Sequence, residues 1–554
     1  MTEKLVIIGG VAGGATAAAR ARRLNENAQI VLFERGDYIS FANCGLPYYI
    51  GGIIKKRESL LVTTADAFRK RYRIDIRLAA EVVAINRAEK CVRVKNVITG
   101  EKYDESYDKL ILSPGAAPIR PPLAGIDGEN IFNLRNIPDT DRIKAYVDEK
   151  QPKSAVVVGG GFIGLEMAEN LVLRGVKTTI VEKLDQVMPP IDADMAGMIH
   201  AHLAEKGVGL LLGDGIQAFE KTGQRLVIRT EKGKTLECDM AILSVGVRPE
   251  NQLARDAGLT IGETGGIAVD ASLRTSDPDI FAIGDAVEID DLVAGMKTKI
   301  PLAGPANKQG RIAADNAMGR NSVFKGVLGT SIVQVFDLAV ASTGLSEKLL
   351  KKNAIPYIAS YTHSGSHAGY YPGAEMLAIK LLFAPETGRI VGAQIVGKDG
   401  VDKRIDVLAT AIFGKMTVFD LEELELAYAP PFGSAKDPVN IAGYVGANIL
   451  KKDVENINWD QLDDIDPENE ILLDLRTDIE FKNSGSIDGA LHIPIDSLRD
   501  RLGELDREKT YIPFCAVGLR GYLGYRILSQ HGYKSKNLSG GFRTYLGAKE
   551  QIVL

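Results

Sequence analysis

The alternation of apolar and polar positions divides the first 34 residues into strand, turn, helix and strand. Lys4 to Ile8 is a short apolar run, and a glycine-rich turn separates it from the Ala- and Arg-rich segment Ala15 to Leu24. A second apolar run, Gln29 to Phe33, ends in Glu34. Short apolar strands on either side of one helical segment predict a parallel α/β unit.

The turn of this unit has glycines in a pattern typical of dinucleotide sites. Its sequence, Gly9-Gly10-Val11-Ala12-Gly13-Gly14, keeps Gly9 and Gly14 of the GxGxxG motif but has Val11 at the middle position. Glu34 lies at the distance along the chain at which such folds place a carboxylate on a ribose hydroxyl. The strand, the helix and the acid together favour a dinucleotide site over a chance glycine-rich turn.

The same pattern recurs once, from residue 154. Ser154 to Val158 is predicted to be a strand, Leu165 to Arg174 a helix, and Thr178 to Val181 a strand that ends in Glu182. Two such units predict two dinucleotides, with helix N-termini facing the pyrophosphates. The simplest pairing is a flavin dinucleotide on the first unit and a nicotinamide dinucleotide on the second.

The second turn has an unbroken GxGxxG motif, with Gly159, Gly161 and Gly164 at its glycine positions. The Glu182 carboxylate would accept a hydrogen bond from a ribose 2′-hydroxyl and repel a 2′-phosphate. We therefore expect NADH to be preferred, while Lys183 beside it leaves NADPH possible.

Two other segments end strands at glycine turns and supply candidate cofactor contacts. Tyr107 to Gly115 is predicted to be a strand closing on a tight turn that contains Ser113. Thr275 to Asp285 ends a strand with an acid at a glycine turn, where the carboxylate could bind the polyol chain of a cofactor. Asp285 could equally cap a helix, and the two roles are compatible. Ser113, Gly115, Thr275 and Asp285 are the candidates from these segments.

The stretch Ser40-Phe41-Ala42-Asn43-Cys44-Gly45-Leu46-Pro47-Tyr48 follows the first unit directly. A cysteine at the start of a helix, close to Ser and Asn side chains, is expected to have its thiolate stabilised by the helix N-terminus and nearby donors. The alternative is a buried structural cysteine. The position of Cys44 beside a predicted flavin site favours the reactive reading.

From about Gly326 to Ile449 the pattern changes to strands with glycine-rich turns and has no further glycine fingerprint. Two loops there, Ser364 to Pro372 and Leu426 to Pro431, combine tyrosine and proline in a way that is unusual for a core. They are either surface loops or parts of a site. A polar junction, Lys451 to Asp466, leads to a last segment of about 90 residues.

This last segment contains a second candidate cysteine. Ile471 to Arg476 is predicted to be a buried strand that ends in charge, and a strand over Tyr511 to Phe514 delivers the loop Cys515-Ala516-Val517-Gly518-Leu519-Arg520-Gly521 to the top of a helix. We expect several backbone N–H groups and the Arg520 guanidinium to point at the Cys515 sulfur and stabilise a thiolate or persulfide anion. The alternative is a helix cap with an incidental cysteine.

The composition of the chain excludes several classes of function. The 554 residues allow about three or four domains. A net charge of -5 gives no basic footprint for nucleic acid, and no apolar run reaches the length of about 18 residues that a membrane span needs. We also expect no secretory leader. Four cysteines without a CxxC pair fit a reducing cytoplasm and favour neither disulfides nor a metal site.

By these motifs residues 1 to about 449 resemble the FAD- and NAD(P)H-dependent disulfide reductases with a single active-site cysteine, and among them the coenzyme A-disulfide reductases. The most specific motif is SFANCGLPY around Cys44, in which the second cysteine of the wider superfamily's CxxxxC pair is absent. Residues from about 460 to 554 resemble a rhodanese domain with Cys515 in its persulfide-carrying loop. Fused proteins of this kind include NADH-dependent persulfide reductases.

The resemblance implies an α/β fold of four parts. These are two Rossmann-type dinucleotide-binding domains, an α+β dimerisation domain and a C-terminal α/β rhodanese domain. We expect the FAD-binding domain at 1–150, completed by about 270–325, the NAD(P)H-binding domain at 151–270, the dimerisation domain at 326–449 and the rhodanese domain at 460–554.

The resemblance also assigns roles to single residues. Cys44 matches the redox cysteine that cycles between a thiolate and a mixed disulfide with coenzyme A. Tyr370 and Tyr428 match tyrosines that reach the active site from the partner subunit, which implies a homodimer. At Asn307, where some relatives have a histidine, the chain departs from the pattern and a role for Asn307 is in doubt. Residues matching coenzyme A contacts are Thr16, Arg20, Arg23, Ser40, Asn43 and Lys436.

The implied activity is the NAD(P)H-driven reduction of a coenzyme A disulfide, persulfide or polysulfide through Cys44, with Cys515 handling sulfane sulfur. Arg20 and Arg23 would bind coenzyme A phosphates, unless they only form a solvated helix face. One rival is an NADH oxidase or peroxidase that cycles Cys44 through sulfenic acid. Another is a flavin-bound sulfur carrier or redox sensor.

Overall fold

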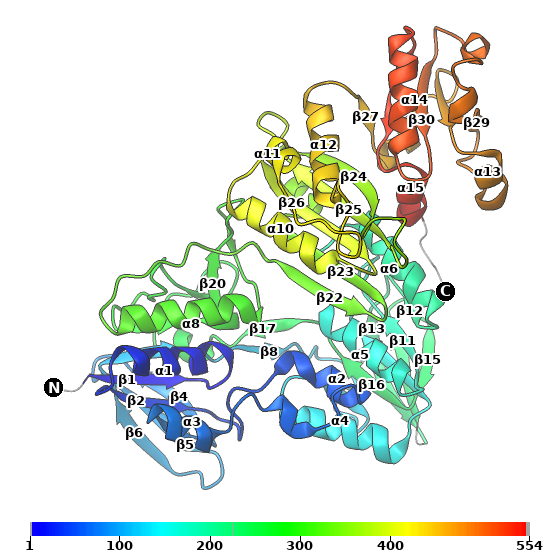
Figure 1. Cartoon of the computed structure of the whole chain (residues 1–554). Coiled ribbons are helices and arrows are strands. Elements are labelled where there is room, and N and C mark those ends of the chain that lie inside the picture. The colour runs from blue at the N-terminus through cyan, green and yellow to red at the C-terminus, as the bar shows by residue number, and fades with distance from the viewer. Residues whose placement is uncertain (1–2, 224, 550–554) are drawn as a thin grey trace. The chain divides into compact units, whose positions relative to one another are not determined.

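The computed structural model describes residues 3–223 and 225–549, so residues 550–554 of the predicted rhodanese segment lie outside it. The chain forms two compact units (Figure 1). Unit 1 comprises Met1–Lys183 and Asp214–Gly329, and unit 2 comprises Leu184–Gly213 and Thr330–Leu554. In the described part of the chain, no helix is both long and apolar enough to cross a membrane.

The first sheet of unit 1 contains the first predicted strand-turn-helix-strand segment. Its parallel strands run in the order β19-β7-β1-β2-β3. They are β1 (Lys4–Ile8), β2 (Gln29–Phe33), β3 (Asp75–Arg77), β7 (Lys109–Leu112) and β19 (Ile280–Ala282). Helices α1 (Ala12–Leu24) and α8 (Ala303–Ala317) pack against each other (Figure 1). β19 and α8 come from the range predicted to complete the first domain.

The second parallel sheet has β10 (Ser154–Val158) between β11 (Lys177–Val181) and β16 (Met240–Leu243). β9 (Ile131–Asn133) pairs with the other side of β16. Helix α5 (Phe162–Leu173) follows β10, and α4 (Ile137–Lys150) follows β9. The second sheet therefore includes β9, which precedes residue 151 in the sequence and pairs in parallel with β16.

Short antiparallel sheets and helices complete unit 1. The sheets are β4 (Ala80–Asn86), β5 (Cys91–Asn96) and β6 (Lys102–Ser106); β13 (Ile216–Thr222), β14 (Arg225–Thr230) and β15 (Thr235–Cys238); and the pair β8 (Ala116–Pro118) and β17 (Val247–Pro249). A mixed sheet has β18 (Ile267–Ala268), β20 (Val287–Asp290) and β21 (Lys297–Thr298). The remaining α-helices are α2 (Leu46–Gly51), α3 (Ala65–Tyr72) and α7 (Gln252–Asp256).

Unit 2 is built on a five-stranded antiparallel sheet in the order β22-β23-β26-β25-β24. Its strands are β22 (Ser331–Val335), β23 (Leu338–Gly344), β24 (Ile358–Gly365), β25 (Met376–Phe383) and β26 (Ile390–Gly397). The helices are α6 (Ala193–Glu205), α9 (Glu347–Lys352), α10 (Val401–Phe413), α11 (Val418–Glu423) and α12 (Pro438–Leu450). The predicted strands are present, but the glycine-rich pattern did not reveal the helices α10 to α12, of which α10 packs on β23 and β26, α12 packs on β24 and β25, and α11 packs on α12.

A parallel sheet in the order β29-β28-β30-β31 forms the last part of unit 2. Its strands are β28 (Glu470–Asp474), β29 (Leu491–His492), β30 (Thr510–Phe514) and β31 (Lys534–Ser535), with helices α13 (Asp478–Ser484), α14 (Leu519–Gln530) and α15 (Gly541–Lys549). The predicted polar junction is not a free linker. It contains β27 (Asn456–Ile457), which pairs with β32 (Asn537–Leu538), and a 3-10 turn over Trp459–Asp464.

Candidate active site

The first glycine turn and the N-terminus of α1 form a cradle suited to an anion. A Cβ on Gly14 would lie 1.8 Å from the Gly9 carbonyl oxygen, so only glycine lets α1 begin this close to β1. No side chain caps α1, and its first turn has no acidic residue. The N–H groups of this turn and the helix dipole therefore favour a phosphate, as the predicted FAD site requires.

Glu34, at the end of β2, is held beside this turn. Its carboxylate accepts the N–H of Gly10 at 2.8 Å and that of Gly36 at 2.9 Å. These bonds fix the acid at the mouth of the cradle, where the sequence analysis predicted a ribose contact.

The second glycine turn repeats the arrangement. Glu182 follows β11 and accepts the N–H of Gly160 at 2.6 Å in a buried position. A Cβ on Gly164 would lie 1.9 Å from the Gly159 carbonyl oxygen, while a Cβ on Gly161 would meet nothing within 4 Å. Gly161 caps α5 without a side chain, and the first turn of α5 has no acid. The residues fit a second dinucleotide, NADH or NADPH.

Lys183, the cation that keeps the binding of NADPH possible, forms an ion pair with Glu231 at 2.9 Å. Its side chain is largely exposed, so this pair is weak.

Of the other four cofactor candidates, Ser113, Gly115 and Asp285 follow the carboxyl ends of β7 and β19, whereas Thr275 lies beside the start of β19. The backbone N–H of Ser113 donates to the Ile8 carbonyl at 2.8 Å, and Gly115 has a left-handed φ of 77°. The hydroxyl of Thr275 donates to the Ile280 carbonyl at 2.9 Å, so it stabilises its own turn. Asp285 lies in a 3-10 turn, Gly284–Ala286, and burial raises its pKa although Arg135 opposes the shift. Their cofactor roles remain predictions.

Cys44 lies in a 3-10 turn, Asn43–Gly45, that leads directly into α2. The residue is exposed and forms no disulfide, so it is not a buried structural cysteine. Ser40, four residues earlier, adopts a left-handed φ of 47°, and its N–H donates to the Gly10 carbonyl at 2.9 Å. This bond ties the cysteine stretch to the first glycine turn.

The expected stabilisation of the Cys44 thiolate is not provided by the protein groups around it. Although the residue has an exposed surface, the protein atoms crowded around its sulfur raise the pKa of the thiol, and the carboxylates of Glu166 and Asp285 raise it further. Only its own backbone N–H lowers the pKa. Burial and the two acids together outweigh this one hydrogen bond.

Glu166 is a residue that the sequence analysis did not single out. It lies on α5, and the Tyr48 hydroxyl is 3.5 Å from its Oε1. Burial raises the pKa of Glu166 to about 7, with Glu169 adding to the shift and the Tyr48 hydroxyl opposing it. The only sequence signal was an acid two residues after the last glycine of a cofactor turn, which does not reveal its proximity to Cys44.

The predicted coenzyme A contacts of α1 are already partnered within unit 1. Thr16 donates from its hydroxyl to Asn307 Oδ1 at 2.5 Å, so Asn307 has a structural contact with a substrate candidate. Arg20 Nε pairs with Asp315 at 2.7 Å, and both side chains are largely buried. Arg23 is exposed, as is Asn43. Because Arg20 is paired and largely buried, it does not belong to a solvated helix face. That it binds a coenzyme A phosphate stays a prediction.

The two predicted tyrosines come together in unit 2. The hydroxyls of Tyr370 and Tyr428 are 2.6 Å apart, and the side chains are 76% and 48% exposed. The hydrogen bond to Tyr428 raises the pKa of Tyr370. Lys436 is exposed in the same unit. Two exposed aromatic side chains joined through their hydroxyls are consistent with a site completed by another chain.

The Cys515 loop lies between β30 and α14, and Cys515 itself is fully buried. Its sulfur accepts the N–H of Gly518 at 3.2 Å. Among the described residues this is the one backbone N–H that hydrogen-bonds Sγ, where several were predicted. Arg520 is near the sulfur, but its guanidinium donates to Glu480 at 2.7 and 2.6 Å, and Glu480 with Cys515 raises the pKa of Arg520.

Glu480 was also missed by the sequence analysis. It serves as the third residue of α13 and forms a capping box with Thr477. The Arg520 guanidinium, the largest influence, lowers the pKa of Glu480 to about 2 despite the opposing effect of burial. The capping box of Thr477 and Glu480 can be recognised in the sequence. The ion pair between Glu480 and Arg520 of the cysteine loop cannot, because it forms only in the tertiary structure.

Comparison with known proteins places these features in a family. Residues 3–310 match the model for pyridine nucleotide-disulphide oxidoreductases, 330–438 its dimerisation domain, and 458–548 a rhodanese-like domain. The described residues 3–223 and 225–549 contain no group of His, Cys, Asp and Glu side chains arranged for a metal ion.

Three relatives cover most of the chain. Coenzyme A disulfide reductase of Staphylococcus haemolyticus is 38% identical over 443 residues, which is 80% of this chain and 99% of that protein. The crystal structure of reduced Bacillus anthracis CoADR-RHD is 52% identical, with a TM-score of 0.97 over 100% of both chains. A NAD-dependent persulfide reductase from A. fulgidus is 38% identical, with a TM-score of 0.92 over 98% of this chain and 100% of that one. The chain therefore belongs to the pyridine nucleotide-disulphide oxidoreductases, with a dimerisation domain and a rhodanese-like domain after its two nucleotide-binding domains.

Proposed function

We propose that the protein is an FAD-dependent enzyme that uses NADH to reduce coenzyme A disulfide, persulfide or polysulfide through Cys44. The observation that carries this proposal is a single exposed cysteine tied by Ser40 to the first glycine turn, in a chain that also has a cysteine loop in a rhodanese-like domain. The relatives that cover most of the chain are named for these reactions.

The two glycine turns would hold FAD and NADH, with Glu34 and Glu182 as ribose contacts. Bound FAD supplies the two-electron chemistry that links a nicotinamide to a disulfide. Glu182 would favour NADH because its carboxylate repels a 2′-phosphate. Each of these roles rests on the uncapped helix N-termini and the fixed acids described above.

The role of Cys44 in this reaction is thiol–disulfide exchange. Its thiolate attacks one sulfur of a coenzyme A disulfide, which forms a mixed disulfide with Cys44 and releases one coenzyme A thiolate. Two electrons and a proton then return Cys44 to the thiolate and release the second coenzyme A as a thiol. With a persulfide, attack on the sulfur of the bound coenzyme A gives the same mixed disulfide and releases hydrogen sulfide.

The dimer would complete the site. Tyr370 and Tyr428 of the partner subunit would supply the proton that a leaving thiolate takes up, since their joined hydroxyls form a short donor pair. Thr16, Arg20, Arg23, Ser40, Asn43 and Lys436 are proposed to bind coenzyme A. We place the protein in the cytoplasm, where thiols stay reduced.

Cys515 would carry sulfane sulfur. Its thiolate attacks the outer sulfur of a donor such as thiosulfate, so that a Cys515 persulfide forms and sulfite leaves. Attack by an acceptor thiolate or cyanide on the outer sulfur restores Cys515. This second cysteine makes persulfide, rather than plain disulfide, the substrate that uses the whole chain.

The test is steady-state NADH oxidation with coenzyme A persulfide and, separately, coenzyme A disulfide, using the intact chain, Cys44→Ser and Cys515→Ser. We expect Cys44→Ser to abolish both reactions and Cys515→Ser to lower only the use of persulfide or polysulfide donors. Cys91→Ser is the matched control, because Cys91 lies on β5 and belongs to neither cysteine loop. An unchanged rate in Cys44→Ser would overturn the proposal.

The same assay separates the rivals. Consumption of oxygen that disappears with Cys44→Ser, without disulfide turnover, would indicate an oxidase that uses a sulfenic acid at Cys44. A bound flavin that NADH fails to bleach within seconds would instead indicate a sulfur carrier or sensor.

A further inference from the structure

Helix α15 supports the backbone of the Cys515 loop. The N–H groups of Phe542 and Arg543, at the start of α15, donate to the carbonyls of Cys515 and Ala516 at 2.8 and 3.0 Å. These are two of the N–H groups that a helix cannot satisfy internally. The start of the cysteine loop is therefore positioned by α15 and follows any displacement of that helix.

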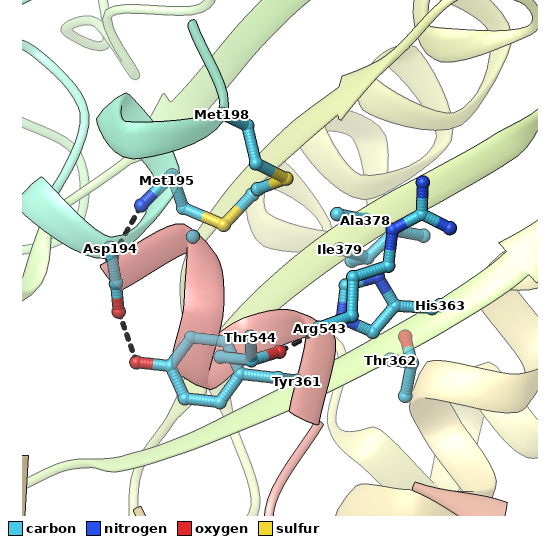
Figure 2. A pocket seen from close by; sticks show the side chains of 11 residues that line it. Asp194, Met195, Met198, Tyr361, Thr362, His363, Ala378, Ile379, Arg543 and Thr544 are labelled. Carbon is cyan, nitrogen blue, oxygen red and sulfur yellow. Dashed lines mark hydrogen bonds between the residues drawn. The ribbon is translucent and has the colours of Figure 1, made fainter. Parts of the chain in front are cut away.

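The same helix is anchored outside the rhodanese-like domain. Thr544 lies one turn into α15, and its hydroxyl is 2.8 Å from Nε2 of His363 on β24 (Figure 2). The hydroxyl also donates to the Gly540 carbonyl at 3.2 Å. Because Thr544 has one proton, His363 must donate from Nε2 and be the neutral Nε2–H tautomer.

The neutral state of His363 agrees with its surroundings. Burial, to which the charge of Arg543 adds, lowers the pKa of His363 to about 3. Its Nδ1 is buried and has no hydrogen-bond partner in the described chain. The ring is thus a fixed donor to Thr544 at neutral pH.

A second anchor joins α6, β24 and the start of the rhodanese-like domain. Asp194 on α6 accepts hydrogen bonds from the Tyr361 hydroxyl and, at 3.3 Å, from the indole N–H of Trp459 (Figure 2 shows Tyr361 and Asp194). Lys380 on β25, which is fully buried, pairs with Asp194 at 2.8 Å. The backbone N–H of Tyr361 donates to Ser539 at 3.3 Å.

The helices α6 and α15 meet in close contact. A Cβ on Gly197 of α6 would lie 1.6 Å from the carbonyl oxygen of Gly547 on α15. The cavity in Figure 2 between these elements has a volume of only about 10 Å³, less than a small ligand needs. The space is therefore a packed interface and not a binding pocket.

We propose that Thr544, His363 and the Gly197 contact are positioning elements for Cys515. Docking of α15 on α6 and β24 holds the carbonyls of Cys515 and Ala516, and with them the sulfur, in the geometry for sulfane sulfur transfer. The sulfur-transfer part of this inference rests on the proposed function of Cys515. The geometry of the loop is measured independently of that function.

Two variants disturb the docking in different ways, each with a matched control. Thr544→Val removes the hydroxyl at nearly constant volume, and Thr544→Ser keeps it. Thr410→Val is the control, because the exposed Thr410 on α10 also donates to a carbonyl four residues earlier, that of Asp406, at 2.8 Å. Gly197→Ala forces α6 and α15 apart, whereas a Cβ on Gly503 meets nothing within 4 Å, so Gly503→Ala is its control.

The first measurement is alkylation of Cys515 by iodoacetamide in the FAD-loaded full chain, followed by site-resolved mass spectrometry with Cys44 as the internal reference. We expect Thr544→Val and Gly197→Ala to alkylate Cys515 about fivefold faster, because the loop opens more often when its support is loosened. Thr544→Ser and both controls should stay within about twofold of the natural chain. Wild-type alkylation rates in both docking variants would overturn the inference.

The second measurement is transfer of sulfur from thiosulfate to cyanide. We expect the kcat of Thr544→Val to fall about tenfold with little change in the KM for thiosulfate, and Thr544→Ser to restore it. NADH-driven reduction of coenzyme A disulfide should be unaffected in the same preparation. A role confined to stability would instead lower both activities together with the folded fraction, and would overturn positioning.

The two hypotheses fail in different ways. If the natural chain transfers no sulfur, the proposed role of Cys515 fails, while the alkylation rates still decide whether docking sets the loop. If sulfur is transferred and the docking variants change neither rate, the proposed function stands and the positioning role is rejected.

Discussion

At the scale of single residues, the surroundings of Cys44 differ from what its motif suggested. The short turn and the helix after it predicted a stabilised thiolate, but burial, and after it the carboxylates of Glu166 and Asp285, raise the pKa of the Cys44 thiol. Glu166 itself has a pKa of about 7. Its charge, and therefore the reactivity of Cys44, should change within the pH range of the cell.

We predict that Glu166→Gln makes Cys44 more reactive above pH 7. The Glu166 carboxylate becomes charged as pH rises through about 7 and then disfavours a second negative charge on Cys44, so replacing it lowers the pKa of the thiol. The pH profile of Cys44 alkylation should move to lower pH by about one unit. Glu149→Gln, an exposed acid of the same unit, is the control, and an identical profile in both variants would refute the prediction.

A second prediction concerns the choice of nicotinamide. In Glu182→Gln the side chain keeps its size but loses the charge that would repel a 2′-phosphate. The ratio of kcat/KM for NADPH to that for NADH should rise about tenfold, since juxtaposed like charges are costly. The exposed Glu129 serves as the control position in Glu129→Gln. A ratio that stays constant would mean that Glu182 does not read the 2′ position.

At the scale of elements, α6 joins with β24, β25 and α9 through buried charges. Lys380 on β25 pairs with Asp194 at 2.8 Å, with Asp192 at 3.1 Å and with Glu347 at 2.6 Å. Burial alone would lower the pKa of Lys380, but these carboxylates raise it well above its ordinary value. The lysine is therefore charged, and it neutralises acids that could not otherwise be buried together.

We predict that Lys380→Met destabilises unit 2 by about 3–5 kcal/mol, because it leaves the buried acids without their cation. Urea unfolding followed by the fluorescence of Trp459, the single tryptophan of the chain, reports on this unit. Lys398→Met removes a more exposed pair with Asp337 and should leave the urea midpoint nearly unchanged. Equal midpoints for the two variants would contradict the prediction.

At the scale of the whole molecule, the proposed active site needs two chains. The dimerisation domain matched at residues 330–438 contains Tyr370 and Tyr428, whose exposed hydroxyls are joined. A symmetric dimer would place the same pair of tyrosines at each of two sites.

This arrangement predicts complementation between two inactive variants. Cys44→Ser supplies intact tyrosines, and the double variant Tyr370→Phe, Tyr428→Phe supplies an intact Cys44. Their isolated heterodimer should have about half the activity of the natural dimer, because one of its two sites combines both natural parts. The mass of each species should be twice that of the 59.8 kDa chain. A heterodimer as inactive as its parents would exclude tyrosines contributed across the dimer.

Much of the fold was readable because its signals are local. β1, β2 and β10 have the predicted bounds, since short apolar runs bordered by glycine turns mark parallel strands clearly. The helices α10 to α12 were missed although α10 buries residues at helical spacing, because the prediction followed the glycine-rich turns of this range; the strand β27 was missed because it has only two residues. The candidate cysteines and glycine turns were likewise found from local motifs, whereas Glu166 and Glu480 were not.

The sequence by itself determined the two nucleotide-binding turns, the two cysteine loops and the family, because each depends on residue types at fixed short spacings. The tertiary structure alone decided which charges surround those loops. The raised pKa of Cys44 depends on α5, and the support of Cys515 depends on α15 meeting α6 and β24. Residues more than a hundred positions apart create these effects, and their electrostatic and packing energies depend on distance in space, which spacing along the chain does not encode.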